Sequence, residues 1–464
     1  MTNPTLAARR SPLDAPPRPE PAAPRPYHFP RFERRTLDNG MRLLVAPVHK
    51  LPVVSVVAVV DAGATCDPQG REGLAQLAAH ALTEGTTSLD AVALAQRVER
   101  LGASLDAGAD WDGALVSLTT LTRHVDEAFA LFADVLTRPV FPEREIERLK
   151  AERIAELMHL ATEPRGLADE AFARAVYAPD SRYAHPEGGS RTSVPALTRD
   201  DVAAFHAARY RPSATTLVVA GDITLDAAEA LARRTLGDWT GEAAPRAAAD
   251  DRAAATERRT HLVAKADAQQ SELRVGHVGV PRSHPDYFPL VVMNAILGGL
   301  FNSRVNLNLR ERHGYTYGAH SGFDWRVQAG PFVVASAVQS ESTAAAAREV
   351  LSEIDRIRTE PVAPEELSLA TSYLDGVFPI RYETTAAIAG ALANLTLYGL
   401  PDDYFDAYRG RIRAVTAADV QRVAAEHLHP DRLQLLVAGD PEALRAPLEA
   451  LEFGPLLLTE PEEG

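Results

Sequence analysis

Gln76 and His80 lie four residues apart in the segment Gly73–Thr86, a spacing that places both side chains on one face of a helix. Two imidazoles at this spacing can bind one metal ion, and catalytic zinc usually takes three protein ligands and leaves one position for water. Gln76 offers only a neutral amide, which is a poor zinc ligand beside imidazole or carboxylate. Ala79, directly before His80, has no group that could take a proton from a metal-bound water. The segment therefore has the spacing of a metal-binding helix without its full set of chemical groups.

This segment resembles the signature of the M16 (pitrilysin/insulinase-type) metallopeptidases, in which a His-x-x-Glu-His helix binds zinc and carries the base. Gln76 stands where the family has its first His, Ala79 where it has the Glu, and His80 keeps the last His. The family's third ligand, a Glu about 76 residues after the second His, corresponds to Glu156. The resemblance implies that these four positions form a degenerate site that holds no metal in this chain.

Glu156 and His80 also have simpler interpretations. Residues 143–157 show the pattern of an amphipathic helix, with apolar residues inward and many charges outward. A Glu on the charged face of such a helix is usually solvated. A His on a half-buried helix is more often hydrogen-bonded than metal-bound, because two ligands rarely hold a metal.

Arg310 and Tyr317 form a second candidate site in the segment Asn308–Gly318. The segment resembles the M16 element Arg-Glu-x-x-Gly-Leu-x-Tyr, whose Arg and Tyr bind substrate. An Arg fork can hold a peptide carbonyl or carboxylate with two donors, and a Tyr hydroxyl can donate to the oxyanion that forms when water attacks an amide. Gly314 is expected to end the helix, and Thr316–Tyr317 to begin a strand. The alternative is an Arg at the negative end of a helix and a Tyr packed in the strand.

The chain contains an internal repeat. Residues 197–222 and 415–440 align without a gap at an offset of 218 residues, and ten of the 26 positions are identical. In each copy a Thr, Thr198 or Thr416, can cap an amphipathic helix by accepting a hydrogen bond from its first turn. A Pro ends each helix, and a short apolar run followed by Gly-Asp predicts a strand and a turn. Common descent of the two halves explains this better than two unrelated units.

The patterns in both halves predict an α+β fold of two homologous domains, each a mostly antiparallel sheet with helices packed on one face. Strands are expected near Met41–Pro47, Val53–Asp61, His261–Ala266 and Glu272–Val280, and helices near Gly73–Glu84 and Pro285–Leu297. The expected division is a disordered Pro-rich tail at 1–30, a first domain at 31–240, a linker at 241–259 and a second domain at 260–455. The M16 resemblance, which spans roughly residues 32–450, implies the same architecture.

Composition limits the range of functions. The 464 residues carry a net charge of −15, and no basic cluster with interleaved aromatics is present, which argues against nucleic-acid binding. Cys66 is the one cysteine, so neither an intrachain disulfide nor a Cys-based zinc site can form. The sequence shows no apolar segment of membrane-spanning length and no signal-peptide core, so we expect a cytoplasmic location, with a periplasmic one still open.

Two-subunit M16 peptidases divide their site, so that one chain keeps the zinc motif and the other keeps the Arg/Tyr pair. This chain has the second pattern, as in the alpha subunit of mitochondrial processing peptidase and in bacterial M16B heterodimers. The resemblance implies a noncatalytic subunit whose Arg310 and Tyr317 bind peptide or unfolded polypeptide. Zinc is expected in a partner with an intact His-x-x-Glu-His motif, and Tyr317 would stabilise the oxyanion in trans. The alternatives are a structural scaffold subunit, and an independent enzyme that uses His80, Glu156 and a relocated base.

Overall fold

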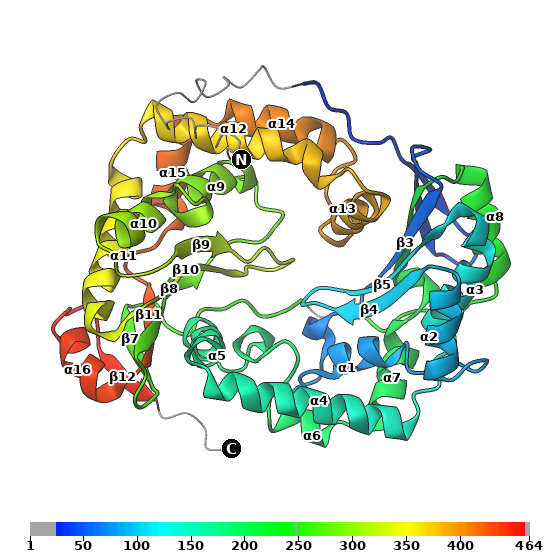
Figure 1. The fold of residues 1–464 in the computed structure, drawn as a ribbon, viewed down its shortest axis with the longest axis horizontal. Helices are drawn as coiled ribbons and strands as arrows, with labels where there is room; N and C mark the ends of the chain where they lie inside the picture. The colour runs from blue at the N-terminus through cyan, green and yellow to red at the C-terminus, as the bar shows by residue number, and fades with distance from the viewer. Residues whose placement is uncertain (1–24, 246–247, 460–464) are drawn as a thin grey trace, which may run out of the picture.

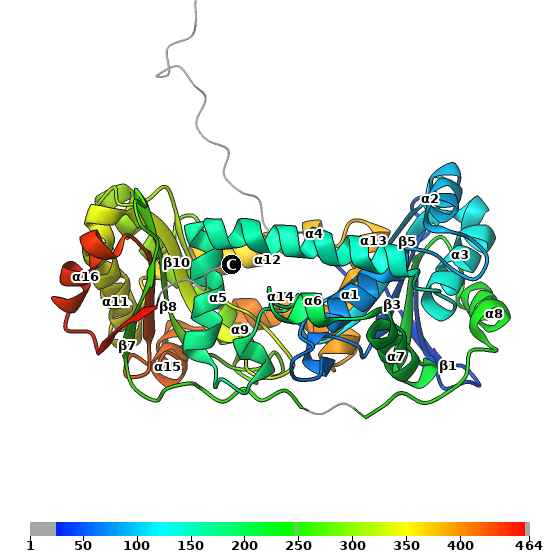
Figure 2. The ribbon, with the colours of Figure 1, turned by 90° about the horizontal axis from the view of Figure 1, so that it is seen from below.

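The computed structural model describes residues 25–245 and 248–459, and the predicted disordered tail lies outside the described residues up to residue 24. In Figure 1 the elements are arranged around a ring, with most of the first half on the right and most of the second half on the left. Figure 2 shows the ring from the side, where the chain after α8 (Leu225–Leu236) runs along the lower edge toward the second half. At the end of the tail region, Phe29 stacks on Phe405 with 4.1 Å between ring centroids.

Each half of the chain builds one six-stranded sheet, with the orders β1-β2-β6-β3-β5-β4 and β12-β7-β11-β8-β10-β9. The strands are β1 (Glu33–Thr36), β2 (Arg42–Pro47), β3 (Val53–Val60), β4 (Ser104–Ala109), β5 (Ala114–Leu121), β6 (Thr215–Gly221), β7 (Arg259–Ala264), β8 (Gln270–Val278), β9 (Ala319–Phe323), β10 (Pro331–Gln339), β11 (Gln434–Gly439) and β12 (Leu456–Thr459). The pairs β2–β6, β7–β11 and β7–β12 are parallel, and the others are antiparallel. The predicted pair of related α+β domains with mostly antiparallel sheets is confirmed.

The repeated units have the predicted local structure. α7 (Arg199–Arg209) and α15 (Ala417–His427) each follow a Thr whose hydroxyl accepts from the amide of an Asp three residues on. The Asp carboxylate accepts from the Thr amide in return, which satisfies a second N–H group at the helix start. The prediction that Thr198 and Thr416 are N-caps is confirmed.

Helices of each half cover one face of their own sheet. Besides α7 and α8, the helices of the first half are α1 (Leu74–Ala81), α2 (Ala91–Arg100), α3 (Val125–Thr137), α4 (Glu143–Thr162), α5 (Pro164–Val176) and the short α6 (Ser193–Ala196). Besides α15, those of the second half are α9 (Tyr287–Asn294), α11 (Thr343–Thr359), α12 (Pro364–Arg381), α13 (Thr385–Leu397), α14 (Tyr404–Ala414), α16 (Pro441–Glu449) and the short α10 (Arg304–Asn306). Two π-helical segments, η6 (Ala295–Gly299) and η7 (Leu307–Arg312), follow α9 and α10.

The other face of each sheet is covered by a helix from the opposite half. α13 packs across β3 and β6 of the first sheet, and α5 packs across β8 and β11 of the second (Figure 1). Val57 of β3 shares one buried cluster with Leu392 of α13. Phe172 of α5 shares another with Leu436 of β11. Because strand side chains alternate between the two faces, each sheet needs this second helix to bury its inner face.

The β9–β10 hairpin adds polar contacts between the halves. The Tyr177 hydroxyl donates to the Ala329 carbonyl at 2.9 Å. The Arg326 guanidinium lies 4.2 Å from the ring centroid of Trp111, within the range of a cation–π contact. Together with the exchanged helices, these contacts fix the two sheets relative to each other.

One helical stretch of the described chain, residues 287–312, is long and apolar enough to cross a membrane by length and composition. Just over half of its most apolar window is buried inside the protein, as in a core helix. Core helices of this kind pass the same test, so the absence of a membrane span stays a prediction.

Removing the aromatic ring of Phe172 tests the exchanged packing. We expect Phe172→Ala to lower the free energy of unfolding by about 3–5 kcal/mol, because the buried side chain leaves a cavity between α5 and the second sheet. Denaturant-induced unfolding measures the change. Val92→Ala, at an exposed position on α2, serves as the control. A Phe172→Ala variant as stable as this control would contradict the proposed dependence of the fold on α5.

Two buried histidines make stability depend on pH. Burial lowers the pKa of both His206 and His277 to about 4, whereas the unfolded side chain titrates near 6.5. The unfolded state therefore binds more protons between these values, so stability is full above about pH 6.5 and falls as the pH drops toward 4. Each histidine contributes on the order of 3 kcal/mol to this loss.

The pH effect is measured as the unfolding midpoint at pH 7 and pH 5. His206→Gln should reduce the difference between the two midpoints, because Gln does not titrate and still offers a donor for the Leu136 carbonyl. Replacement of the exposed His159 by Gln should leave the difference unchanged. An unchanged difference in the His206→Gln variant would show that His206 does not carry the effect.

Candidate functional site

A buried carboxylate anchors the start of α1, the helix that carries two of the candidate positions. Asp67 accepts hydrogen bonds from the amides of Gly73 at 2.8 Å and Ala75 at 2.7 Å, and forms an ion pair with Arg182 at 2.9 Å. Gly73 has a φ of +95°, which glycine adopts without strain. A carboxylate is favourable at the positive end of a helix. The first turn of α1 is therefore held in one place.

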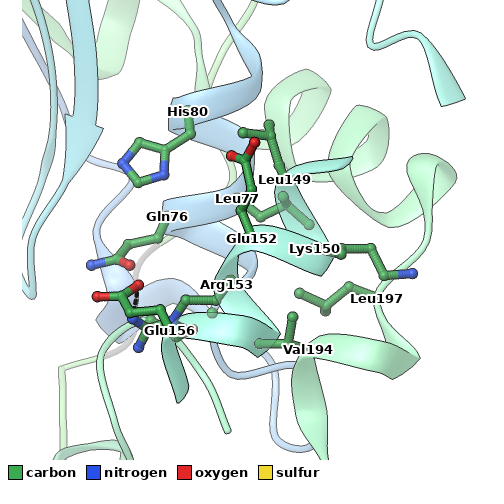
Figure 3. Close-up of a pocket in the computed structure, with 12 residues that line it drawn as sticks. Gln76, Leu77, His80, Leu149, Lys150, Glu152, Arg153, Glu156, Val194 and Leu197 are labelled. Atoms are coloured by element: carbon green, nitrogen blue, oxygen red, sulfur yellow. Dashed lines mark hydrogen bonds and ion pairs between the residues drawn. The ribbon is translucent and has the colours of Figure 1, made fainter. Parts of the chain in front are cut away.

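α4 brings Glu156 to the side chains of α1. Figure 3 shows Gln76 and His80 from α1 and Glu156 and Arg153 from α4 along one pocket, whose volume is about 230 Å³. The structure thus brings three of the predicted metal-ligand positions together. Ala79, which stands at the position of the family's general base, is fully buried and does not line the pocket.

Gln76 forms a hydrogen bond with a carboxylate. Its Nε2 donates to Oε1 of Glu187 at 3.1 Å. Burial raises the pKa of the Glu187 carboxyl, and the hydrogen bond from Gln76 opposes part of that shift. Gln76 therefore acts as a hydrogen-bond donor in this pocket.

Arg153 supplies a fixed positive charge. Its Nη1 donates to Oε2 of Glu156 at 2.6 Å, and its Nε donates to the Gly188 carbonyl at 3.0 Å. A Cβ atom on Gly188 would lie 2.4 Å from Oε1 of Gln76 and 2.7 Å from Nη2 of Arg153, so a side chain there would displace the ends of these two side chains. The guanidinium thus pairs with the carboxylate that corresponds to the third metal ligand.

His80 keeps its imidazole at the edge of the pocket. Partial burial lowers the pKa of His80, the Arg153 guanidinium lowers it further, and the Glu156 carboxylate acts in the opposite direction. His80 is therefore mainly neutral at pH 7.

This set of donors does not fit a zinc ion. His80 is the one remaining imidazole, the Glu156 carboxylate is paired with Arg153, and the Gln76 amide faces Glu187. Catalytic zinc takes three good ligands, and a fixed guanidinium repels a divalent cation. The pocket therefore supports no metal-dependent step.

A second group of possible metal ligands is also engaged elsewhere. Among the described residues, His284, Asp286 and His427 have ligand atoms within 4.8 Å of one another. Both carboxylate oxygens of Asp286 accept hydrogen bonds from Arg422, at 2.7 and 3.1 Å, and one also contacts His427 at 2.8 Å. These residues form an ion-pair network that joins the start of α9 to the end of α15.

The Arg310 and Tyr317 side chains are presented at the surface of the second half. The Arg310 guanidinium, on η7, lies 4.6 Å from the ring centroid of Phe301. Tyr317 is 91% exposed, so the alternative of a Tyr packed in a strand is wrong. Gly314 has a φ of +67°, and its amide donates to the Arg310 carbonyl, so it ends the helix as predicted.

The strand after this helix begins later than predicted. β9 starts at Ala319, so Thr316 and Tyr317 lie in the loop before it. Thr316 Oγ1 donates to the Ala337 carbonyl at 2.6 Å and accepts from the Gly318 amide at 3.0 Å. This local bonding replaces the strand ladder and directs Tyr317 toward solvent.

The two candidate sites lie in different halves of the molecule. Neither Arg310 nor Tyr317 lines the pocket around Gln76. In Figure 1, α1 lies on the right and α10, directly before η7, on the left. The pair therefore does not complete the chain's own degenerate site.

The site residues predicted from the sequence did not include Arg153, Glu187 or Asp67. Arg153 occurs one turn before Glu156, a spacing that brings the two side chains together on a helix and could have indicated the ion pair. Glu187 is 111 residues from Gln76, and no local pattern indicates their hydrogen bond. Asp67 lies six residues before Gly73, so a carboxylate shortly before α1 was the available signal for its contact with the first turn.

Comparison with known proteins agrees with this geometry. Residues 44–183 match the family model described as Insulinase (Peptidase family M16), and residues 196–374 match the one described as Peptidase M16 inactive domain. This chain belongs to the M16 peptidase family, and its metal-site positions are those of an inactive-type member.

Relatives span nearly the whole chain. An uncharacterized zinc protease of Mycobacterium tuberculosis is 26% identical over 442 residues, which cover 93% of this chain and 99% of the relative. The protein named non-peptidase homolog YmxG of Helicobacter pylori is 22% identical, over 84% of this chain and 90% of the relative. The solved structure of a peptidase M16 inactive domain from Pseudomonas fluorescens has a TM-score of 0.83 and 27% identity, covering 88% of this chain and 98% of that one.

Restoring one ligand tests the effect of Arg153 on metal binding. We expect Gln76→His alone to leave the chain without bound zinc, because Arg153 still holds Glu156. Gln76→His combined with Arg153→Leu should bind zinc at least about tenfold more tightly, since three ligands become available and the repelling charge is gone. Zinc content after dialysis, with and without chelator, measures this. Stoichiometric zinc in the Gln76→His variant would contradict the inhibitory effect of Arg153.

Proposed function

We propose that this chain is a peptide-binding subunit that completes the active site of a zinc-bearing M16 partner in a heterodimeric metalloendopeptidase. The observation that carries the proposal is that Tyr317 is exposed and Arg310 is partly exposed, in a chain whose own metal positions do not fit a zinc ion. A pair that does not line its own degenerate pocket can act on a site that another chain supplies.

The chemistry expected of the pair follows from its groups. Arg310 would hold a peptide carbonyl or carboxylate with two parallel donors, which fixes the substrate backbone. The Tyr317 hydroxyl would donate to the oxyanion that forms on the scissile amide. The partner's zinc and general base would supply the attacking water. Neither zinc nor a base is needed from this chain.

The proposal also specifies a partner, a substrate class and a location for this chain. The partner is an M16 subunit with an intact His-x-x-Glu-His motif, and the substrates are peptides or unfolded polypeptides. The chain itself holds no cofactor and binds no nucleic acid. The location proposed is the cytoplasm, with the periplasm as the alternative.

A second candidate function is a structural subunit of a larger assembly without proteolysis. The name of the Helicobacter pylori relative, a non-peptidase homolog, favours this candidate. In that case Arg310 and Tyr317 would have no catalytic consequence, so one experiment separates the two functions.

Substitutions in the assembled pair provide that experiment. We expect Arg310→Ala and Tyr317→Phe each to lower kcat/KM of the pair by about 100-fold or more, because each removes a donor aimed at the substrate or the oxyanion. Arg312→Ala, at an exposed position on the same helical segment, is the control and should leave kcat/KM unchanged. An unchanged kcat/KM in both test variants would favour the structural function.

A further inference from the structure

We propose that a pocket between α9, α12 and β9 binds one bulky apolar side chain, preferably aromatic, of the peptide held by Arg310 and Tyr317. The proposal rests on the peptide-binding function given above and adds a substrate preference to it. The pocket has a volume of about 300 Å³ and lies in the second half of the molecule. This volume is ample for one large side chain but not for a folded domain.

Aromatic rings form much of the lining. The aromatic residues that line the pocket are Tyr287, Phe323, Trp325, Tyr373 and Tyr408. Small-molecule and side-chain sites are commonly lined by aromatic groups of this kind, with a few polar groups at defined positions. Aromatic rings also pair favourably with another aromatic ring in edge or stacked geometry. The lining also carries polar groups from Asn294, Arg381 and the tyrosine hydroxyls. It therefore suits an aromatic side chain, whose ring pairs with the lining rings while the attached backbone meets the polar groups.

The walls of the pocket are fixed by their own contacts. Trp325 stacks on Phe323 with 5.1 Å between centroids, and it meets Tyr287 at 4.7 Å in an edge arrangement. The guanidinium of Arg282 lies 3.5 Å from the centroid of the Tyr287 ring on the same wall. Rings held on several sides lose little freedom when a ligand binds, so the pocket is preformed.

A glycine on β9 leaves space in the pocket. Gly322 lines the pocket, and a Cβ atom built on it would meet no atom within 4 Å. Any larger residue at this position would therefore project into open space instead of into the packed core. This makes Gly322 the position at which the pocket can be filled without disturbing its walls.

Two short segments of chain connect residues that line the pocket with Arg310 and Tyr317. Leu300 lines the pocket, and the next residue, Phe301, is 62% exposed and carries the Arg310 guanidinium over its ring. Tyr317 lies just before β9, the strand whose Gly322 lines the pocket. An extended peptide held by the pair can therefore place a nearby side chain in the pocket.

The rim of the pocket adds an exposed apolar surface and a charge. Leu369, Tyr373 and Ile380 on α12 are exposed large apolar residues, and Tyr373 also lines the pocket. Arg381 lines the same pocket and forms no ion pair with another described residue. A peptide can match both features. Its apolar side chain can cover the exposed apolar residues of α12, and its backbone carbonyl or a carboxylate can bind the Arg381 guanidinium.

The test measures binding of fluorescein-labelled, unstructured Gly/Ser peptides to the purified chain by fluorescence anisotropy. One peptide carries a single Phe, and the matched peptide carries Ala at that position. We expect the Phe peptide to bind roughly tenfold or more tightly, the gain from burying one large apolar side chain. Gly322→Val, which β-strand geometry tolerates, should abolish this preference. Gly410→Val, at an exposed α14 position with equally open space around it, should keep it.

The outcomes separate the pocket from the proposed function. Loss of the Phe preference in Gly322→Val alone supports the pocket. Binding of both peptides with equal affinity, or a Phe preference that survives Gly322→Val, would overturn the pocket while leaving peptide binding in place. If the wild-type chain binds neither peptide, the peptide-binding function falls and the pocket with it. A homodimer that Gly322→Val dissolves would assign the pocket to a second copy and overturn the proposal.

Discussion

The central strands of each sheet are buried on both faces, and burying the inner faces requires the two halves to exchange helices. The alternating residues of β3 show this directly: Val56 packs with the helices of its own half, whereas Val57 belongs to the cluster that contains α13. α5 covers the second sheet in the same way. Exposure of either face would cost the fold about 25 cal/mol for each Å² of apolar surface left in water. The exchange therefore fixes the distance between the α1 pocket and the Arg310–Tyr317 pair, and keeps them apart.

The chemistry of the chain follows from this separation. In the α1 pocket, Arg153 provides the positive charge beside Glu156, so the pocket is electrostatically satisfied without a metal ion. In the other half, the Tyr317 hydroxyl has no packing role and is free to meet a substrate. One half of the molecule thus lacks the groups that would activate water, and the other carries the Arg310 and Tyr317 side chains that we propose hold a peptide. A division of labour between two chains accounts for both facts.

The sequence predicted the sheets and the capped repeat units, because each depends on local spacing or on a repeat. Local spacing also places Gln76 and His80 on one face of a helix, whereas the position of Glu156 beside them was implied only by the resemblance to the M16 family. The helix exchange could not be predicted in this way, since an amphipathic helix does not reveal which sheet it covers. The nearly unbroken apolar run of β3 was the available signal, because it is typical of a strand buried on both faces. The late start of β9 depends on the hydrogen bond from Thr316 to Ala337, a contact between residues on different segments.

The most direct test of the central claim is to purify the tagged chain from its own host and identify its companion by mass, with a zinc assay on the purified material. The account predicts a companion of similar size with an intact His-x-x-Glu-His motif and about one zinc per pair, because only the companion has a full ligand set. A zinc-free homodimer, or a large membrane assembly, would contradict the account and leave Arg310 and Tyr317 without a catalytic role.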